Sequence, residues 1–168
     1  MIRDGRYCLG ITAPVVVNAP GDYLPRMTVT PSTIEDTLAE LVEEFDLLGD
    51  WEARISYVID LGKELEPLPD VDRVEVNKVS GCAAQVWLVD RYENGRLRFL
   101  ADSDSAISKG NIALLLRLYS ERAPAEILAF DARAALDRLG LPQALTRQRA
   151  NGLNSMVGRI RAAALAIA

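Results

Sequence analysis

The 168-residue chain contains no histidine. Histidine is the usual general base beside a nucleophilic serine or cysteine, and it is the commonest protein ligand of transition metals. Its absence excludes Ser–His and Cys–His catalytic pairs. The two cysteines, Cys8 and Cys82, are too few for a structural zinc site or for the disulfide framework of a small secreted domain. This cysteine usage fits a reducing cytoplasm best.

The sequence also lacks a hydrophobic run of the roughly 18–20 residues that a membrane helix needs. The apolar stretch at residues 9–19 follows Arg3 and Arg6 and so imitates a signal peptide, but Asp4 and Pro14 interrupt the pattern. We therefore expect no membrane association.

Positive charge is scarce, since the formal net charge is -5. This balance argues against general nucleic-acid binding, which needs cations to neutralise phosphates. Acidic residues crowd positions 35–70, whereas positions 141–168 hold arginines and no acid. Two interpretations stay open: the two segments form solvated helix faces, or one of them helps to dock a protein partner.

The chain length predicts one compact domain. We place it at residues 31–168 and expect residues 1–30 to form a flexible N-terminal extension. Met27, followed by Thr28, Val29 and Thr30, resembles an ordinary start, so translation from either Met1 or Met27 fits the sequence.

Helical periodicity dominates both ends of the predicted domain. A capping box of Ser32 and Glu35 opens the first helix, Gly49 can end it, and Asp50 can cap the next. We expect Trp51, on the apolar face of that second helix, to be buried. Further helices are predicted from caps among residues 102–104 to Tyr119, from Pro124 to Phe130, from Asp131 to Leu139, and from about Asn151 to the end.

The middle of the chain reads as strands. Residues 85–92 are rich in β-branched and aromatic side chains, Asn94-Gly95 is a strong hairpin signal, and residues 96–100 alternate polar and apolar. We expect Trp87 to be buried and a third strand at about residues 74–79. Helices, a small antiparallel sheet and further helices define an α+β fold.

Cys82 is the candidate for chemistry. It follows Gly81 in a run of small side chains, residues 80–84, just before the predicted hairpin. Small neighbours leave a thiol accessible to another protein, although free cysteines are also commonly buried as small hydrophobes. Lys78 and the N-terminus of the helix near Asp104 are possible sources of thiolate activation.

Several short blocks follow one another along the chain, at residues 50–54 (DWEAR), 59–65 (IDLGKEL), 77–82 (NKVSGC) with 85–89 (QVWLV), 101–104 (ADSD) with 109–110 (KG), and 149–153 (RANGL). This ordered set resembles the SufE type of cysteine desulfuration protein, which accepts sulfur for iron–sulfur cluster assembly. The resemblance covers about residues 35–165.

The resemblance implies a fold shared with U-type cluster scaffold proteins and a persulfide carried transiently on Cys82. It implies no cofactor of the chain's own, because pyridoxal phosphate belongs to the partner, a cysteine desulfurase whose turnover the acceptor stimulates. The next recipient is the assembly scaffold. Arg149, Asp104 and Gly81 fall on family positions that suggest docking or the setting of the Cys82 loop. Ala83-Ala84 stands where the family often has Gln-Ser, which affects the loop rather than the thiol.

Two alternatives remain at this point. Cys82 and Cys8 could form a redox pair, which requires their Cα atoms to come within about 7 Å. The protein could instead regulate a partner enzyme without using its thiol, as the uneven charge suggests. We assign purely structural roles to four further residues, Trp51, Trp87, Gly110 and Gly152. Of these, the two glycines are expected to permit close packing of the helices.

Overall fold

The computed structural model describes residues 32–141 and 145–168. The predicted N-terminal extension and Cys8 lie outside them. The α-helices are α1 (Ile34–Leu47), α2 (Trp51–Lys63), α3 (Ala106–Tyr119), α4 (Pro124–Ala129), α5 (Ala132–Arg138) and α7 (Arg147–Leu165). Two 3-10 helices, η1 (Asp70–Asp72) and η2 (Glu75–Asn77), precede strands β1 (Val86–Glu93) and β2 (Arg96–Ser103). The α+β class is thereby confirmed.

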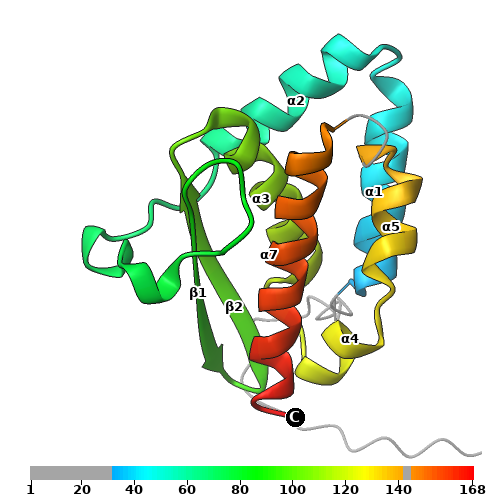
Figure 1. Cartoon of the computed structure of the whole chain (residues 1–168). Helices are drawn as coiled ribbons and strands as arrows, with labels where there is room; N and C mark the ends of the chain where they lie inside the picture. The colour runs from blue at the N-terminus through cyan, green and yellow to red at the C-terminus, as the bar shows by residue number, and fades with distance from the viewer. Residues whose placement is uncertain (1–31, 142–144) are drawn as a thin grey trace, which may run out of the picture. The chain divides into compact units, whose positions relative to one another are not determined.

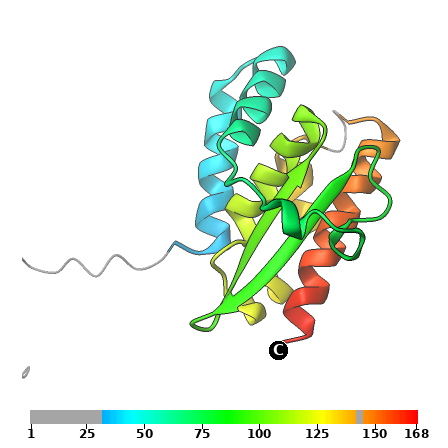
Figure 2. The same ribbon diagram turned by 90° about the vertical axis from the view of Figure 1, so that its left-hand side faces the viewer.

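The helix α3 lies at the centre of the domain, in contact with β2, α1, α2 and α7. Figure 1 and Figure 2 show the β1–β2 hairpin against α3 and α7, with α1 and α2 beyond α3. Gly110 of α3 permits this packing, because a Cβ there would lie 2.1 Å from the carbonyl oxygen of Val58 in α2. The predicted packing role of Gly110 is confirmed.

The first two helices form as predicted, except that the N-cap of α1 is one residue later than expected. The N-cap of α1 is Thr33, which exchanges hydrogen bonds with Asp36, so the predicted Ser32–Glu35 box was wrong by one residue. Gly49 has φ +67° and Asp50 caps α2, as expected. The expectation for Trp51 was wrong: at the first position of α2 it remains 38% exposed, because that helix end projects past the core.

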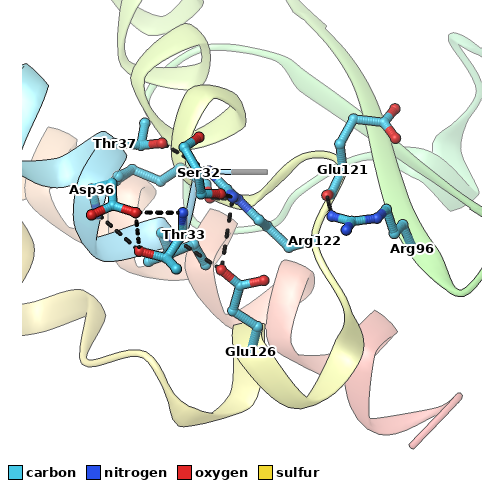
Figure 3. Close-up of polar contacts among 10 residues, drawn as sticks. Ser32, Thr33, Asp36, Thr37, Arg96, Glu121, Arg122 and Glu126 are labelled. Carbon is cyan, nitrogen blue, oxygen red and sulfur yellow. Dashed lines mark hydrogen bonds and ion pairs between the residues drawn. The ribbon is translucent and has the colours of Figure 1, made fainter. Parts of the chain in front are cut away.

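Figure 3 shows how a buried arginine fixes the start of α1. Arg122 lies between α3 and α4 and is 7% exposed. Its guanidinium donates to the hydroxyl of Thr37 at 2.8 Å and to the carbonyl oxygen of Ser32, and lies 3.8 Å from the carboxylate of Glu126. A buried charge needs such partners, so this cluster ties distant parts of the chain together.

The hairpin forms as predicted. Val86 pairs with Ser103 and Glu93 with Arg96 in an antiparallel register. Asn94 and Gly95 have φ of 52° and 80°, as a tight two-residue hairpin turn requires. Trp87, expected in the core, is half-buried.

The predicted strand at residues 74–79 was wrong. Residues 75–77 form η2, and Lys78 makes only an isolated bridge with Trp87. The preceding chain is held instead by polar contacts: the Asn77 side chain donates to the carbonyl oxygen of Asp72 at 2.8 Å. These contacts bend the segment before it can extend along β1.

Two helix starts also differ from expectation. Ser105 caps α3, whereas Asp102 and Ser103 belong to β2 and Asp104 directly follows that strand. Thr146 caps α7, which begins at Arg147 and therefore about a turn before the predicted start at Asn151. In the described ranges, no helix is long and apolar enough to cross a membrane, and no cluster of three or more carboxylate or cysteine side chains could hold a metal ion.

Candidate functional site

Cys82 lies in a closed loop that leads into β1. The amide of Val79 donates to the carbonyl oxygen of Val86 at 2.9 Å, which joins the two ends of residues 80–85. Ser80, Gly81 and Ala83 are exposed, while Cys82 itself is half-buried. The loop therefore presents small side chains to solvent and turns its thiol partly inward.

Gly81 gives the loop its sharp turn. Its φ is +86°, a backbone conformation that favours glycine. A Cβ at this position would also lie 2.9 Å from the hydroxyl oxygen of Ser155 in α7. Gly81 thus supplies both the turn and the close approach of the loop to α7.

Gly152 of α7 is the direct neighbour of the thiol. A Cβ on Gly152 would lie 3.2 Å from both the Cα and the Sγ of Cys82. The Sγ donates to the carbonyl oxygen of Gly152 at 3.7 Å. The predicted packing role of Gly152 is confirmed, but its partner is the candidate site, which sequence reasoning missed.

The surroundings of Cys82 favour the thiol over the thiolate. Burial raises the pKa of the Cys82 thiol. Lys78, a suggested activator, pairs with Glu75 at 2.8 Å and lies 6.0 Å from the ring centre of Trp87. Lys78 is thus engaged with Glu75 and Trp87, and burial is the cause of the shift at Cys82, so the activation suggested for Lys78 is not part of this arrangement.

Asp104 lies at the outgoing end of the loop. Its carboxylate accepts from the amide of Gln85 at 3.0 Å, and its own amide donates to the Gln85 carbonyl oxygen at 3.3 Å. The hydroxyl of Ser103 donates to the same carbonyl oxygen at 2.7 Å. These three bonds fix the residue at which the loop joins β1, a geometry suited to setting the loop.

Asp102 holds the chain that enters the loop. Its carboxylate lies 2.6 Å from Arg73, which precedes η2, and 2.7 Å from Lys109 of α3. Burial alone would raise the pKa of Asp102, but the hydrogen bonds from Lys109 and the Ser103 amide, together with the positive charges of Lys109 and Arg73, outweigh it and lower the pKa. The ion cluster therefore anchors the incoming segment to the hairpin and α3.

Arg149 lies one turn before Gly152 on α7 and is exposed. Its amide donates to the capping hydroxyl of Thr146 at 3.5 Å. Within the described part of the chain its guanidinium forms no ion pair. Cys82, Gly81 and Gly152 thus lie together, with Asp104 at the base of the loop.

Fold and site define a small α+β protein that carries a thiol on a loop packed over a helix. The sequence profile described as SufE, Fe-S metabolism associated domain, matches residues 39–164. The chain therefore belongs to the SufE family, as the resemblance predicted.

Two relatives support this family assignment, and a solved structure supports the fold. The chain is 45% identical to an uncharacterised SufE-like protein of Rhizobium etli over 129 residues, which cover 74% of this chain and 87% of that protein. It is 42% identical to another from Rhizobium meliloti over 132 residues, covering 76% and 94%. The solution structure of a hypothetical protein from Thermus thermophilus has a TM-score of 0.65 at 20% identity, covering 77% and 94%, and supports the fold alone.

Proposed function

We propose that Cys82 accepts sulfur as a persulfide from a pyridoxal-phosphate cysteine desulfurase, stimulates that enzyme by removing its product, and passes the sulfur to an iron–sulfur assembly scaffold in the cytoplasm. The observation that carries the proposal is the position of Cys82 on a glycine-turned loop in a chain of the SufE family. Membership of a family associated with iron–sulfur metabolism supports sulfur transfer as the general activity.

The transfer step is an exchange between sulfurs. The Cys82 thiol loses its proton to solvent, and the thiolate attacks the terminal sulfur of the desulfurase persulfide. A new S–S bond forms on Cys82 as the old one breaks, and the desulfurase cysteine leaves as a thiolate that is reprotonated. No electrons are gained or lost overall, so this chain needs no cofactor of its own.

Intact-mass spectrometry tests the proposal after the protein is mixed with the cognate desulfurase and L-cysteine. We expect a gain of one sulfur, about 32 Da, that maps to Cys82 and disappears on reduction. Cys82→Ala should abolish the adduct and the stimulation of turnover. Cys8→Ser, the matched control, should retain both.

Other outcomes discriminate between the alternatives. Stimulation of the desulfurase by Cys82→Ala would indicate a regulator that does not use its thiol. Loss of function in Cys8→Ser, together with a Cys8–Cys82 disulfide in the wild type, would indicate a redox pair. An adduct on neither cysteine would contradict sulfur acceptance by this protein.

A further inference from the structure

The segment that carries η1 and η2 exposes three valines close together in sequence. Val71 and Val76 are each 80% exposed, and Val74 is 43% exposed. Single apolar side chains on a surface are ordinary, but a group of large exposed hydrophobics between positions 71 and 76 has a different meaning. Such groups are typical of surfaces that another protein covers.

The segment that carries the valines is anchored to the domain on both sides, so the valines have a defined position. Leu68 and Val79, on either side, are 2% and 8% exposed and anchor it in the core. Between them Arg73 reaches the buried carboxylate of Asp102 at 2.6 Å. Valine is also stiff about χ1, so a partner that contacts these side chains loses little binding free energy to ordering them.

The segment is continuous with the Cys82 loop. η2 ends at Asn77, and the Val79–Val86 hydrogen bond closes the loop two residues later. η2 packs against β1, and in Figure 1 the segment extends away from the helices on the β1 side of the domain. A protein that encloses Cys82 closely enough to transfer sulfur therefore also faces the chain that leads into its loop.

The charge around the valines indicates the character of that protein. The side chains of Asp70 and Glu75 remain 94% and 85% exposed although they pair with Arg73 and Lys78. Their partners Arg73 and Lys78 are only 39% and 33% exposed, so carboxylates are the most exposed of these four charged groups. An apolar patch with basic side chains at its rim would complement this surface.

We propose that Val71, Val74 and Val76 form a docking surface for the cysteine desulfurase that loads Cys82. This inference rests on the proposed function and adds to it the place where the donor enzyme binds. Desulfurase affinity then depends on the valines, while the chemistry depends on Cys82.

The test compares a double variant with a matched control. Val71→Thr combined with Val76→Thr keeps the branched shape and adds two hydroxyls to the surface. Leu165→Ser removes an apolar side chain that is 65% exposed at the far end of α7, about 20 Å along the helix from Gly152. Affinity for the cognate desulfurase is measured by titration calorimetry, and the intrinsic reactivity of Cys82 by iodoacetamide alkylation in the Cys8→Ser background.

We expect the double variant to bind the desulfurase at least about tenfold more weakly, with the control within about twofold of the wild type. Alkylation of Cys82 should be unchanged, which shows that the loop is intact. If the double variant loses its cooperative thermal transition, Val71→Thr and Val76→Thr are measured singly, and each should weaken binding with an intact fold.

Two results overturn the docking surface alone. In the first, the wild type gains sulfur and the folded double variant binds the desulfurase with unchanged affinity. In the second, sedimentation shows that the wild type is a dimer and that the substitutions dissociate it. In the second case the valines are covered by a second copy of the chain. If the wild type neither binds the desulfurase nor gains sulfur, the proposed function itself fails, and the docking surface with it.

Discussion

The thiol of Cys82 donates a hydrogen bond to the carbonyl oxygen of Gly152, with sulfur and oxygen 3.7 Å apart. A thiolate has no proton to donate, so this contact stabilises the protonated cysteine, and burial acts in the same direction. Sulfur transfer requires the thiolate. The resting arrangement thus shelters the sulfur and disfavours its reactive, deprotonated form.

The first prediction concerns the pH dependence of this thiol. Because burial raises the pKa of Cys82, its alkylation by iodoacetamide should show an apparent pKa above that of an unstructured cysteine peptide. The measurement is the alkylation rate across the alkaline range in the Cys8→Ser background. An apparent pKa below that of the peptide would contradict this account.

The same raised pKa predicts how stability responds to alkali. The folded state holds the thiol proton more tightly than the unfolded state, so this contribution to the free energy of unfolding is complete below the unfolded-state pKa. It is lost as pH rises from the unfolded-state pKa through the higher folded-state pKa. Urea denaturation of the wild type and Cys82→Ser should diverge over this window, with the wild type losing more stability.

The contact with Gly152 predicts a change in thiol reactivity. Gly152→Ala places a methyl group 3.2 Å from the Cα and Sγ of Cys82, so Cys82 must move by a few tenths of an ångström and its contact with α7 is loosened. We expect Cys82 to be alkylated several times faster. Gly158→Ala is the matched control on the same helix, since a Cβ there meets nothing within 4 Å. The control should leave the rate unchanged and stabilise the protein by about 1 kcal/mol. Equal rates in both variants would refute the contact.

Local signals in the sequence predicted most of the helices and the hairpin. Asn94-Gly95 predicted the hairpin turn correctly because these two residues favour the backbone conformation that such a turn requires. The start of α7 was placed too late because residues 147–151 carry no apolar period, and the capping hydroxyl of Thr146 decides the start instead. Trp51 was misplaced because periodicity gives the face of a helix but not where the core ends along it.

The site was harder to predict than the fold. Gly81 and Cys82 stand together in the sequence, but the approach of Gly152 joins positions 70 residues apart and leaves no local trace. The roles of Asp102 and Asp104 are also non-local, since their partners Arg73 and Gln85 belong to the segments before and after Cys82. Only the family resemblance pointed to these blocks together, and it did not give their contacts.

Asp104 carries a prediction about the outgoing end of the loop. Asp104→Ala removes the acceptor of the Gln85 amide, and we expect a loss of about 1 kcal/mol of stability at most, because the bond is exposed. Hydrogen exchange at the Gln85 amide should become faster. Asp104→Asn retains a side-chain oxygen and should restore much of the protection. Unchanged exchange in Asp104→Ala would show that the carboxylate does not hold the loop.

The close approach of α2 and α3 predicts the largest stability effect. A Cβ on Gly110 would lie 2.1 Å from the carbonyl oxygen of Val58, and one on Gly62 would lie 2.6 Å from the Gly110 amide nitrogen. Backbone atoms cannot rotate away, so Gly110→Ala must separate the two helices and loosen the core around α3. We expect a loss of about 2–4 kcal/mol. Thermal denaturation should show a fall in Tm of roughly 10 °C for Gly110→Ala and no fall for the control, Gly158→Ala. Equal Tm values would mean that the helices are not packed this closely.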